Sequence, residues 1–228
     1  MQFLSIFVNK VNDGYGGFIY EFTTLGYLAI IVAILVLLFI ISMVGYKEKK
    51  KLLNTKQLVF AAVAIALAIV TSNFKLFKAP MGGSVTLCSM FFICLIGYWY
   101  GLKIGITTAL AYGFLQLIMD PYVISFPQLL IDYIFAFGAL GLSGIFKDSK
   151  NGLIKGYLFG IFGRLIFAVI SGLVFFASYA EGSGMSPFIY SVTYNGSYIG
   201  VEAIITIVII LLPPVAQGLR EVRRLAIE

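Results

Sequence analysis

The sequence predicts an all-α integral membrane protein with a six-helix core and one extra N-terminal transmembrane helix. Of its 228 residues, 61% are hydrophobic and only 11% are charged, whereas a soluble domain carries roughly 25% charged residues. Apolar runs of about 20 residues, the length that crosses a hydrocarbon core, recur along the whole chain. The run from Leu25 to Val44 is almost continuously apolar, so it lacks the polar alternation of a membrane barrel strand. Helices, which satisfy their own backbone hydrogen bonds, are therefore expected.

Seven spans are expected, in chain order. They cover Phe22–Tyr46, Gln57–Asn73, Val85–Tyr100, Leu102–Met119, Pro127–Phe146, Gly152–Ser178 and Ser197–Leu219. A charged run, Lys47 to Lys51, separates the first span from the rest. We therefore divide the chain into residues 1–52, with an extracellular N-terminus, the extra helix and a basic linker, and residues 53–228, the six-helix membrane domain. The first span could instead be an uncleaved signal anchor, because no basic segment and cleavage site precede it.

The basic residues predict the orientation. Twelve of the sixteen Lys and Arg residues fall in connections that share one side of the membrane: Lys47, Lys49, Lys50, Lys51, Lys56, Lys103, Lys147, Lys150, Lys155, Arg220, Arg223 and Arg224. By the positive-inside rule that side is cytoplasmic. The N-terminus of this multi-pass cell-membrane protein is then outside and the C-terminus inside. The net charge of +6 is explained by topology, so no nucleic-acid partner is expected.

Several kinds of chemistry have no residues to support them. The chain has no histidine and only two cysteines, Cys88 and Cys94, which gives neither a metal-ligand spacing nor a disulfide framework. It has no phosphate-binding Gly-rich loop ending in Gly-Lys-Ser/Thr and no catalytic constellation. We expect no enzyme, no metal and no cofactor in this chain. Energy for uphill transport would have to come from a partner chain.

The outward connections hold most of the polar variety. The stretch from Tyr179 to Ser197 is expected to be a long loop with three tyrosines, an amide and a carboxylate. Such groups can line an aromatic, hydrogen-bonding pocket. The alternative is the belt of tyrosine and tryptophan side chains found at membrane interfaces.

Asp132 is the most informative single residue. It lies five residues into the span that begins at Pro127, where a lipid-facing carboxylate would cost about 2.5 to 3.5 kcal/mol. It should therefore face the bundle interior, where a cationic or hydrogen-bond-donating ligand could be its partner. The alternative partner is Arg164, which also lies within a span. Glu202 is either a second inward carboxylate or one that reaches toward the membrane surface.

Small residues crowd the second span. Ala62 with Ala66, and Ala64 with Ala68, have the small-xxx-small spacing that lets helices approach closely in lipid. These alanines either dock a partner helix or pack within the same bundle.

The motifs resemble those of a known family. They are Met81-Gly82-Gly83-Ser84-Val85-Thr86-Leu87, Leu115-Gln116, Asp132-Tyr133, Leu140-Gly141-Leu142-Ser143-Gly144, Ser171-Gly172, Phe175 to Ala180, Tyr190, and Tyr194-Asn195-Gly196-Ser197-Tyr198. Over about Lys56 to Leu219 the chain is similar to the thiamine-specific S component of energy-coupling-factor (ECF) importers.

The resemblance implies a six-helix S-component core that holds one thiamine in an outward cavity roofed by the first core loop. The binding residues it implies are Asp132, Tyr133, Tyr122, Tyr190 and Asn195, with Phe176 as a stacking aromatic. It also implies docking of the alanines of the Gln57–Asn73 span, Ala62/Ala66 or Ala64/Ala68, on a transmembrane scaffold subunit. The scaffold works with two ABC ATPases, which consume the ATP.

Two positions depart from the family pattern: Asp132 replaces a glutamate, and Ala168 lies near the position of a histidine. They leave a related pyrimidine or thiazole ligand, or weaker thiamine binding, as alternatives. The remaining alternatives are an S component for hydroxymethylpyrimidine, riboflavin or biotin, a self-sufficient secondary transporter, and a membrane scaffold without a ligand.

Overall fold

The structure is a computed structural model, and it describes residues 6–12, 18–29, 31–32 and 54–227. The predicted first span, Phe22–Tyr46, lies mostly outside the described residues; within it, residues 24–29 and 31–32 are helical. The proposed division between residues 52 and 53 also lies outside them.

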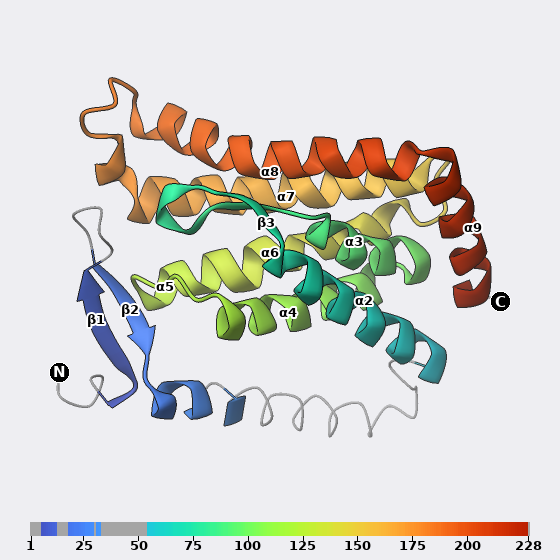
Figure 1. The fold of residues 1–228 in the computed structure, drawn as a ribbon, viewed down its shortest axis with the longest axis horizontal. Helices are drawn as coiled ribbons and strands as arrows, with labels where there is room; N and C mark the ends of the chain where they lie inside the picture. The colour runs from blue at the N-terminus through green and yellow to red at the C-terminus, as the bar shows by residue number, and fades with distance from the viewer. Residues whose placement is uncertain (1–5, 13–17, 30, 33–53, 228) are drawn as a thin grey trace.

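The described part of the membrane domain contains a bundle of six helices, which run along one long axis (Figure 1). Five of them are long and apolar enough to cross a membrane: α2 (Thr55–Asn73), α4 (Leu102–Met119), the composite helix Phe126–Phe146, α7 (Gly152–Phe175) and α8 (Pro187–Leu211). The sixth, α3 (Ser89–Tyr100), is a shorter apolar helix at the centre of the bundle. The predicted six-helix core is confirmed.

The start of the third predicted span, Val85–Tyr100, is wrong. Residues Ser84–Thr86 form strand β4, which pairs with β3 (Lys75–Lys78) across the short 3₁₀ turn η2 (Pro80–Gly82). Cys88 has a φ of 60°, a left-handed conformation that separates the strand from the helix. With 12 residues, α3 is only about 18 Å long, so the hairpin occupies the depth of the bundle that the helix does not fill.

The last predicted span, Ser197–Leu219, is also wrong. Helix α8 begins ten residues earlier, because Ser186 accepts a hydrogen bond from the Ile189 N–H and Pro187 occupies the first helical turn, two strong start signals. It ends at Leu211, and a separate helix, α9 (Pro213–Ile227), begins at the next proline. Helix α7 likewise ends at Phe175 instead of Ser178, and a 3₁₀ turn, η5 (Ala177–Ala180), follows it. Most of the predicted loop is therefore helical.

The composite helix changes its winding along its length. It consists of α5 (Phe126–Leu129), the π-helical turn η3 (Leu130–Phe135), α6 (Ala136–Gly138) and the 3₁₀ segment η4 (Ala139–Phe146). Its second half packs directly against α4: a Cβ placed on Gly141 would lie 2.4 Å from the Ile106 backbone nitrogen. The π-helical turn contains Asp132, and such turns are frequent at functional sites.

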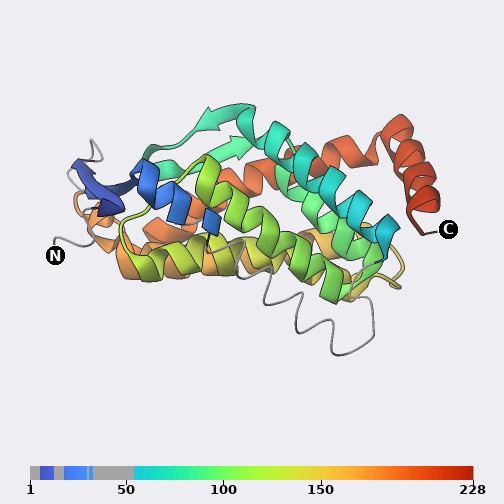
Figure 2. The same cartoon turned by 90° about the horizontal axis from the view of Figure 1, so that it is seen from below.

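A second hairpin lies at one end of the bundle. Strands β1 (Val8–Asn12) and β2 (Phe18–Phe22) pair antiparallel, and the Tyr20 N–H donates to the Val123 carbonyl at 2.5 Å. Figures 1 and 2 both show this hairpin at the opposite end of the long axis from α9. The α7–α8 connection and the start of α5 lie at the hairpin end.

Candidate functional site

One cavity collects all six residues that the sequence singled out for ligand binding. It lies between the β3–β4 hairpin, α4, the composite helix, α7 and α8, and its volume is about 170 Å³. A single buried water needs only about 10–15 Å³, so the cavity has room for a small organic molecule. Its wall includes Tyr122, Asp132, Tyr133, Phe176, Tyr190 and Asn195.

Asp132 faces the cavity from the π-helical turn η3. One carboxylate oxygen, Oδ2, accepts a hydrogen bond from Gln128 Nε2 at 2.5 Å. Gln128 lies one turn earlier, is 1% exposed, and also accepts from the Ile124 N–H and donates to the Tyr122 carbonyl. Among the described residues no hydrogen bond to Oδ1 is found, which leaves that oxygen available to a ligand in the cavity.

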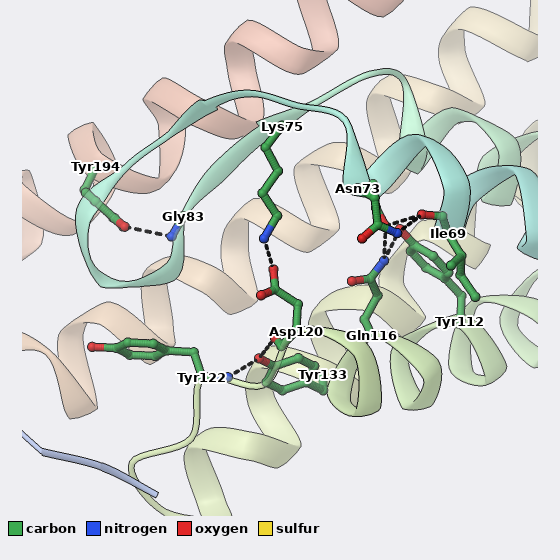
Figure 3. Close-up of polar contacts among 11 residues, drawn as sticks. Ile69, Asn73, Lys75, Gly83, Tyr112, Gln116, Asp120, Tyr122, Tyr133 and Tyr194 are labelled. Atoms are coloured by element: carbon green, nitrogen blue, oxygen red, sulfur yellow. Dashed lines mark hydrogen bonds and ion pairs between the residues drawn. The ribbon is translucent and has the colours of Figure 1, made fainter. Parts of the chain in front are cut away.

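Tyr133 is a positioning residue as well as a wall residue. Its hydroxyl donates to the Asp120 carbonyl at 2.9 Å and accepts from the Tyr122 N–H at 2.7 Å. Figure 3 shows these bonds fixing the loop that follows α4. The hydroxyl of Tyr133, a residue predicted to bind ligand, is thus used to hold the Tyr122 loop, and the Tyr133 ring contributes surface to the cavity.

Aromatic rings line the cavity in two groups. Tyr122 and Phe176 have ring centroids 6.1 Å apart at 36°, and Phe176 continues in a stack with Tyr179 at 5.9 Å. On α8, Tyr190 and Tyr194 stack at 6.3 Å with nearly parallel rings. Both groups offer ring faces of the kind that attract an organic cation.

The side-chain amide of Asn195 forms most of its hydrogen bonds within the protein. Its Nδ2 donates to the Ser191 carbonyl at 3.0 Å and to the Ala168 carbonyl at 3.3 Å, and its Oδ1 accepts from the Tyr198 hydroxyl at 2.8 Å. An amide oxygen has two lone pairs, so one acceptor position remains for a ligand. Sequence reasoning placed Asn195 in a loop; it lies on α8, where it joins that helix to α7.

Glu202 faces inward and is fully engaged. The residue is 3% exposed and accepts from the N–H and hydroxyl of Thr86 at 3.0 and 2.6 Å, and from the Ser89 hydroxyl at 3.2 Å. A carboxylate at the N-terminus of α3 is favoured by the helix dipole. Glu202 therefore fixes the junction of β4 and α3, and the membrane-surface alternative is wrong.

Arg164 does not pair with Asp132. Within the part of the chain that the structure describes, no carboxylate lies within 4.0 Å of its guanidinium. The guanidinium instead lies 4.2 Å from the centre of the Phe137 ring, one turn and a half further along the composite helix than Asp132. Arg164 and Ala168, one turn apart on α7, both line the cavity.

The β3–β4 hairpin forms the roof and is attached at two points. The Tyr194 hydroxyl accepts from the Gly83 N–H at 3.0 Å and donates to the Pro80 carbonyl. On the other side, Lys75 forms an ion pair with Asp120, as Figure 3 shows. The attachment to α8 requires glycine at position 83, because a Cβ there would lie 2.7 Å from the Tyr194 hydroxyl.

Sequence reasoning missed several wall residues. Gln128 had a signal, since it lies four residues before Asp132 and so on the same helix face. Gln116, which donates to Ser72 and Tyr112, and Ser171 were noticed only as parts of motifs. Tyr194 had no separate signal, because its partner hairpin is more than 100 residues away in the chain.

The two alanine pairs of α2 point in different directions. Ala64 and Ala68 are 6% and 0% exposed and belong to the hydrophobic core, so they are not accessible to a partner helix. Ala62 and Ala66 are exposed. Only Ala62 and Ala66 are available as the docking face that the resemblance implies.

The arrangement suits reversible binding. It combines a carboxylate with one unclaimed oxygen, ring faces on two sides and a roof held by hydrogen bonds.

Comparison with known proteins gives three matches. A family model described as Thiamine transporter protein (Thia_YuaJ) matches residues 58–220. The thiamine transporter ThiT of Bacillus subtilis (strain 168) is 39% identical over 168 residues, which cover 68% of this chain and 85% of that protein. The solved structure of ThiT from Listeria monocytogenes superposes with a TM-score of 0.60 at 22% identity, covering 72% of this chain and 96% of that one. The last match concerns the fold alone.

Proposed function

The chain belongs to the thiamine transporter protein family, and we propose that it is the thiamine-binding S subunit of an ECF-type importer. The observation that carries the proposal is the juxtaposition of Asp132, with its unclaimed Oδ1, and the ring faces of Tyr122, Phe176 and Tyr190 in one cavity. Thiamine combines an aminopyrimidine, which offers hydrogen-bond donors and acceptors, with a thiazolium cation.

The proposed roles follow from the geometry. Asp132 accepts a hydrogen bond from the ligand and offsets its charge, while the aromatic rings contact the cation. Asn195 contributes its remaining acceptor position. Tyr133 keeps Tyr122 in place through the two bonds of its hydroxyl.

The energy source lies outside the chain in this proposal. The sequence contains no phosphate-binding loop, so ATP is consumed by two partner ATPases through a transmembrane scaffold. The exposed pair Ala62 and Ala66 on α2 is the proposed docking face. The proposed orientation places the roofed end of the bundle outside the cell, since the basic connections gather at the other end.

Uptake into proteoliposomes tests this function. The chain alone should bind labelled thiamine without accumulating it, and the chain assembled with scaffold and ATPases should accumulate it when ATP is enclosed on the cytoplasmic side. The matched control is the same complex with an ATPase that cannot hydrolyse ATP. Concentrative uptake by the chain alone would contradict the proposal and favour a self-sufficient secondary transporter.

A further inference from the structure

Ser171 is a cavity residue with an unused hydroxyl. It lies on α7 and lines the cavity, although the residue is only 2% exposed. Its Oγ makes no hydrogen bond of 3.5 Å or less with any residue that the structure describes. Buried polar groups in proteins nearly always have a partner, so an unpartnered hydroxyl on a cavity wall indicates a ligand group.

The missing hydrogen bond of Ser171 is unusual among the buried hydroxyls of this wall. Ser191, opposite on α8, donates to the Val169 carbonyl at 3.0 Å. The other buried serine and threonine hydroxyls of the wall, those of Thr86 and Ser89, also have partners. Of these four buried hydroxyls, only that of Ser171 has no hydrogen-bond partner among the described residues.

Asp132 provides the complementary half of a recognition site. Asp132 lines the same cavity as Ser171, and among the described residues the Ser171 hydroxyl forms no hydrogen bond of standard geometry with it. The orientation of the Gln128 amide is fixed, because its oxygen must accept from the Ile124 N–H and its nitrogen then faces Asp132 Oδ2. Among the described residues, the wall of this cavity therefore presents one free acceptor, Asp132 Oδ1, and one free donor, the Ser171 O–H.

We propose that Ser171 is a further ligand-binding residue, which together with Asp132 recognises a ligand edge that carries a hydrogen-bond donor beside an acceptor. Asp132 accepts from the donor and Ser171 donates to the acceptor. The edge of an aminopyrimidine has this pattern, with an exocyclic amine next to a ring nitrogen. The inference rests on the proposed function, because it assigns this edge of thiamine to these two side chains.

The test compares Ser171→Ala with Thr206→Val. Thr206 is the matched control: it is 0% exposed and its hydroxyl also has no partner within 3.5 Å, but it does not line the cavity. Dissociation constants are measured by titration calorimetry for thiamine and for two thiamine analogues, each with one pyrimidine ring nitrogen replaced by CH. The ligand-free melting temperature confirms that each variant is folded.

Ser171→Ala should weaken thiamine binding roughly 2- to 12-fold, the effect of one neutral hydrogen bond, and Thr206→Val should leave it unchanged. For the analogue that lacks the acceptor, wild type and Ser171→Ala should bind equally. Equal thiamine affinity of wild type and Ser171→Ala would overturn the inference. So would an equal loss for all three ligands, because the side chain would then act through the shape of the wall. A wild-type chain that binds no thiamine would instead overturn the proposed function, and this inference with it.

Discussion

Within its apolar span, Asp132 accepts a hydrogen bond from Gln128 and faces the cavity. An unpaired carboxylate in a membrane interior is costly, and the Gln128 amide compensates part of that cost through its 2.5 Å bond. Arg164 forms no ion pair with any residue that the structure describes. In the proposed function, a ligand supplies the remaining partner of this side chain.

Replacing Asp132 by Asn tests this role. The variant should bind thiamine about tenfold to a hundredfold more weakly, because a hydrogen bond to a charged group contributes roughly 1.5 to 3 kcal/mol. Its ligand-free melting temperature should not fall, since no ion pair is broken and the new amide oxygen still accepts from Gln128. Titration calorimetry and a thermal melt measure the two effects separately.

Asp120→Asn is the control. This carboxylate also lines the cavity but is paired with Lys75 at the surface, and an exposed pair contributes about 1 kcal/mol at most. Its affinity loss should stay below about fivefold. An Asp132→Asn protein that binds normally but melts early would show that Asp132 has a structural role instead.

The location of a single residue could be predicted from the sequence where one energetic cost dominates. A carboxylate in an apolar span cannot face lipid, and that argument alone placed Asp132 inside. The same argument left Glu202 open, because its partners Thr86 and Ser89 lie more than 110 residues away. The hydrogen bonds between the Tyr133 hydroxyl and the backbone of Asp120 and Tyr122 could not be predicted either. They depend on how the loop after α4 folds back onto the composite helix.

At the scale of elements, composition located the helices but not all of their ends. Helix α4 lies at its predicted bounds, with Gly101 before it and Asp120 after it. The polar residues Tyr190 and Asn195 suggested a loop, whereas they lie on helix α8 and line the cavity. A helix that lines a polar site breaks the apolar pattern by which spans are recognised, and the Ser186-Pro187 start signal was the better guide.

Helix α2 gives a prediction with its control on the same element. Ala62→Leu with Ala66→Leu should leave thermal stability and thiamine binding unchanged and abolish uptake by the assembled complex, because large side chains on the exposed face separate the partner helix. Ala64→Leu with Ala68→Leu should destabilise the chain itself, by about 1–3 kcal/mol per overpacked site. Melting curves and proteoliposome uptake distinguish the two pairs. Full uptake by the Ala62/Ala66 variant would mean that this face contacts lipid only.

At the scale of the whole molecule, the fold separates two regions along its long axis. The β3–β4 and β1–β2 hairpins lie toward one end, and α9 crosses the other (Figures 1 and 2). The β3–β4 hairpin contributes to the wall of the cavity. Shortening α3 to 12 residues provides the space for the roof and the cavity within the bundle. The six-helix core was predictable from hydropathy. The cavity was not, because it arises from contacts between elements that are distant in the chain.

The most direct test of the central claim is a calorimetric titration of the detergent-solubilised chain with thiamine, hydroxymethylpyrimidine, riboflavin and biotin. A single cavity that combines Asp132 with ring faces predicts saturable one-to-one binding of thiamine, with no binding of riboflavin or biotin and weaker binding of hydroxymethylpyrimidine, which lacks the thiazolium cation. Binding of riboflavin or biotin without binding of thiamine would contradict the account.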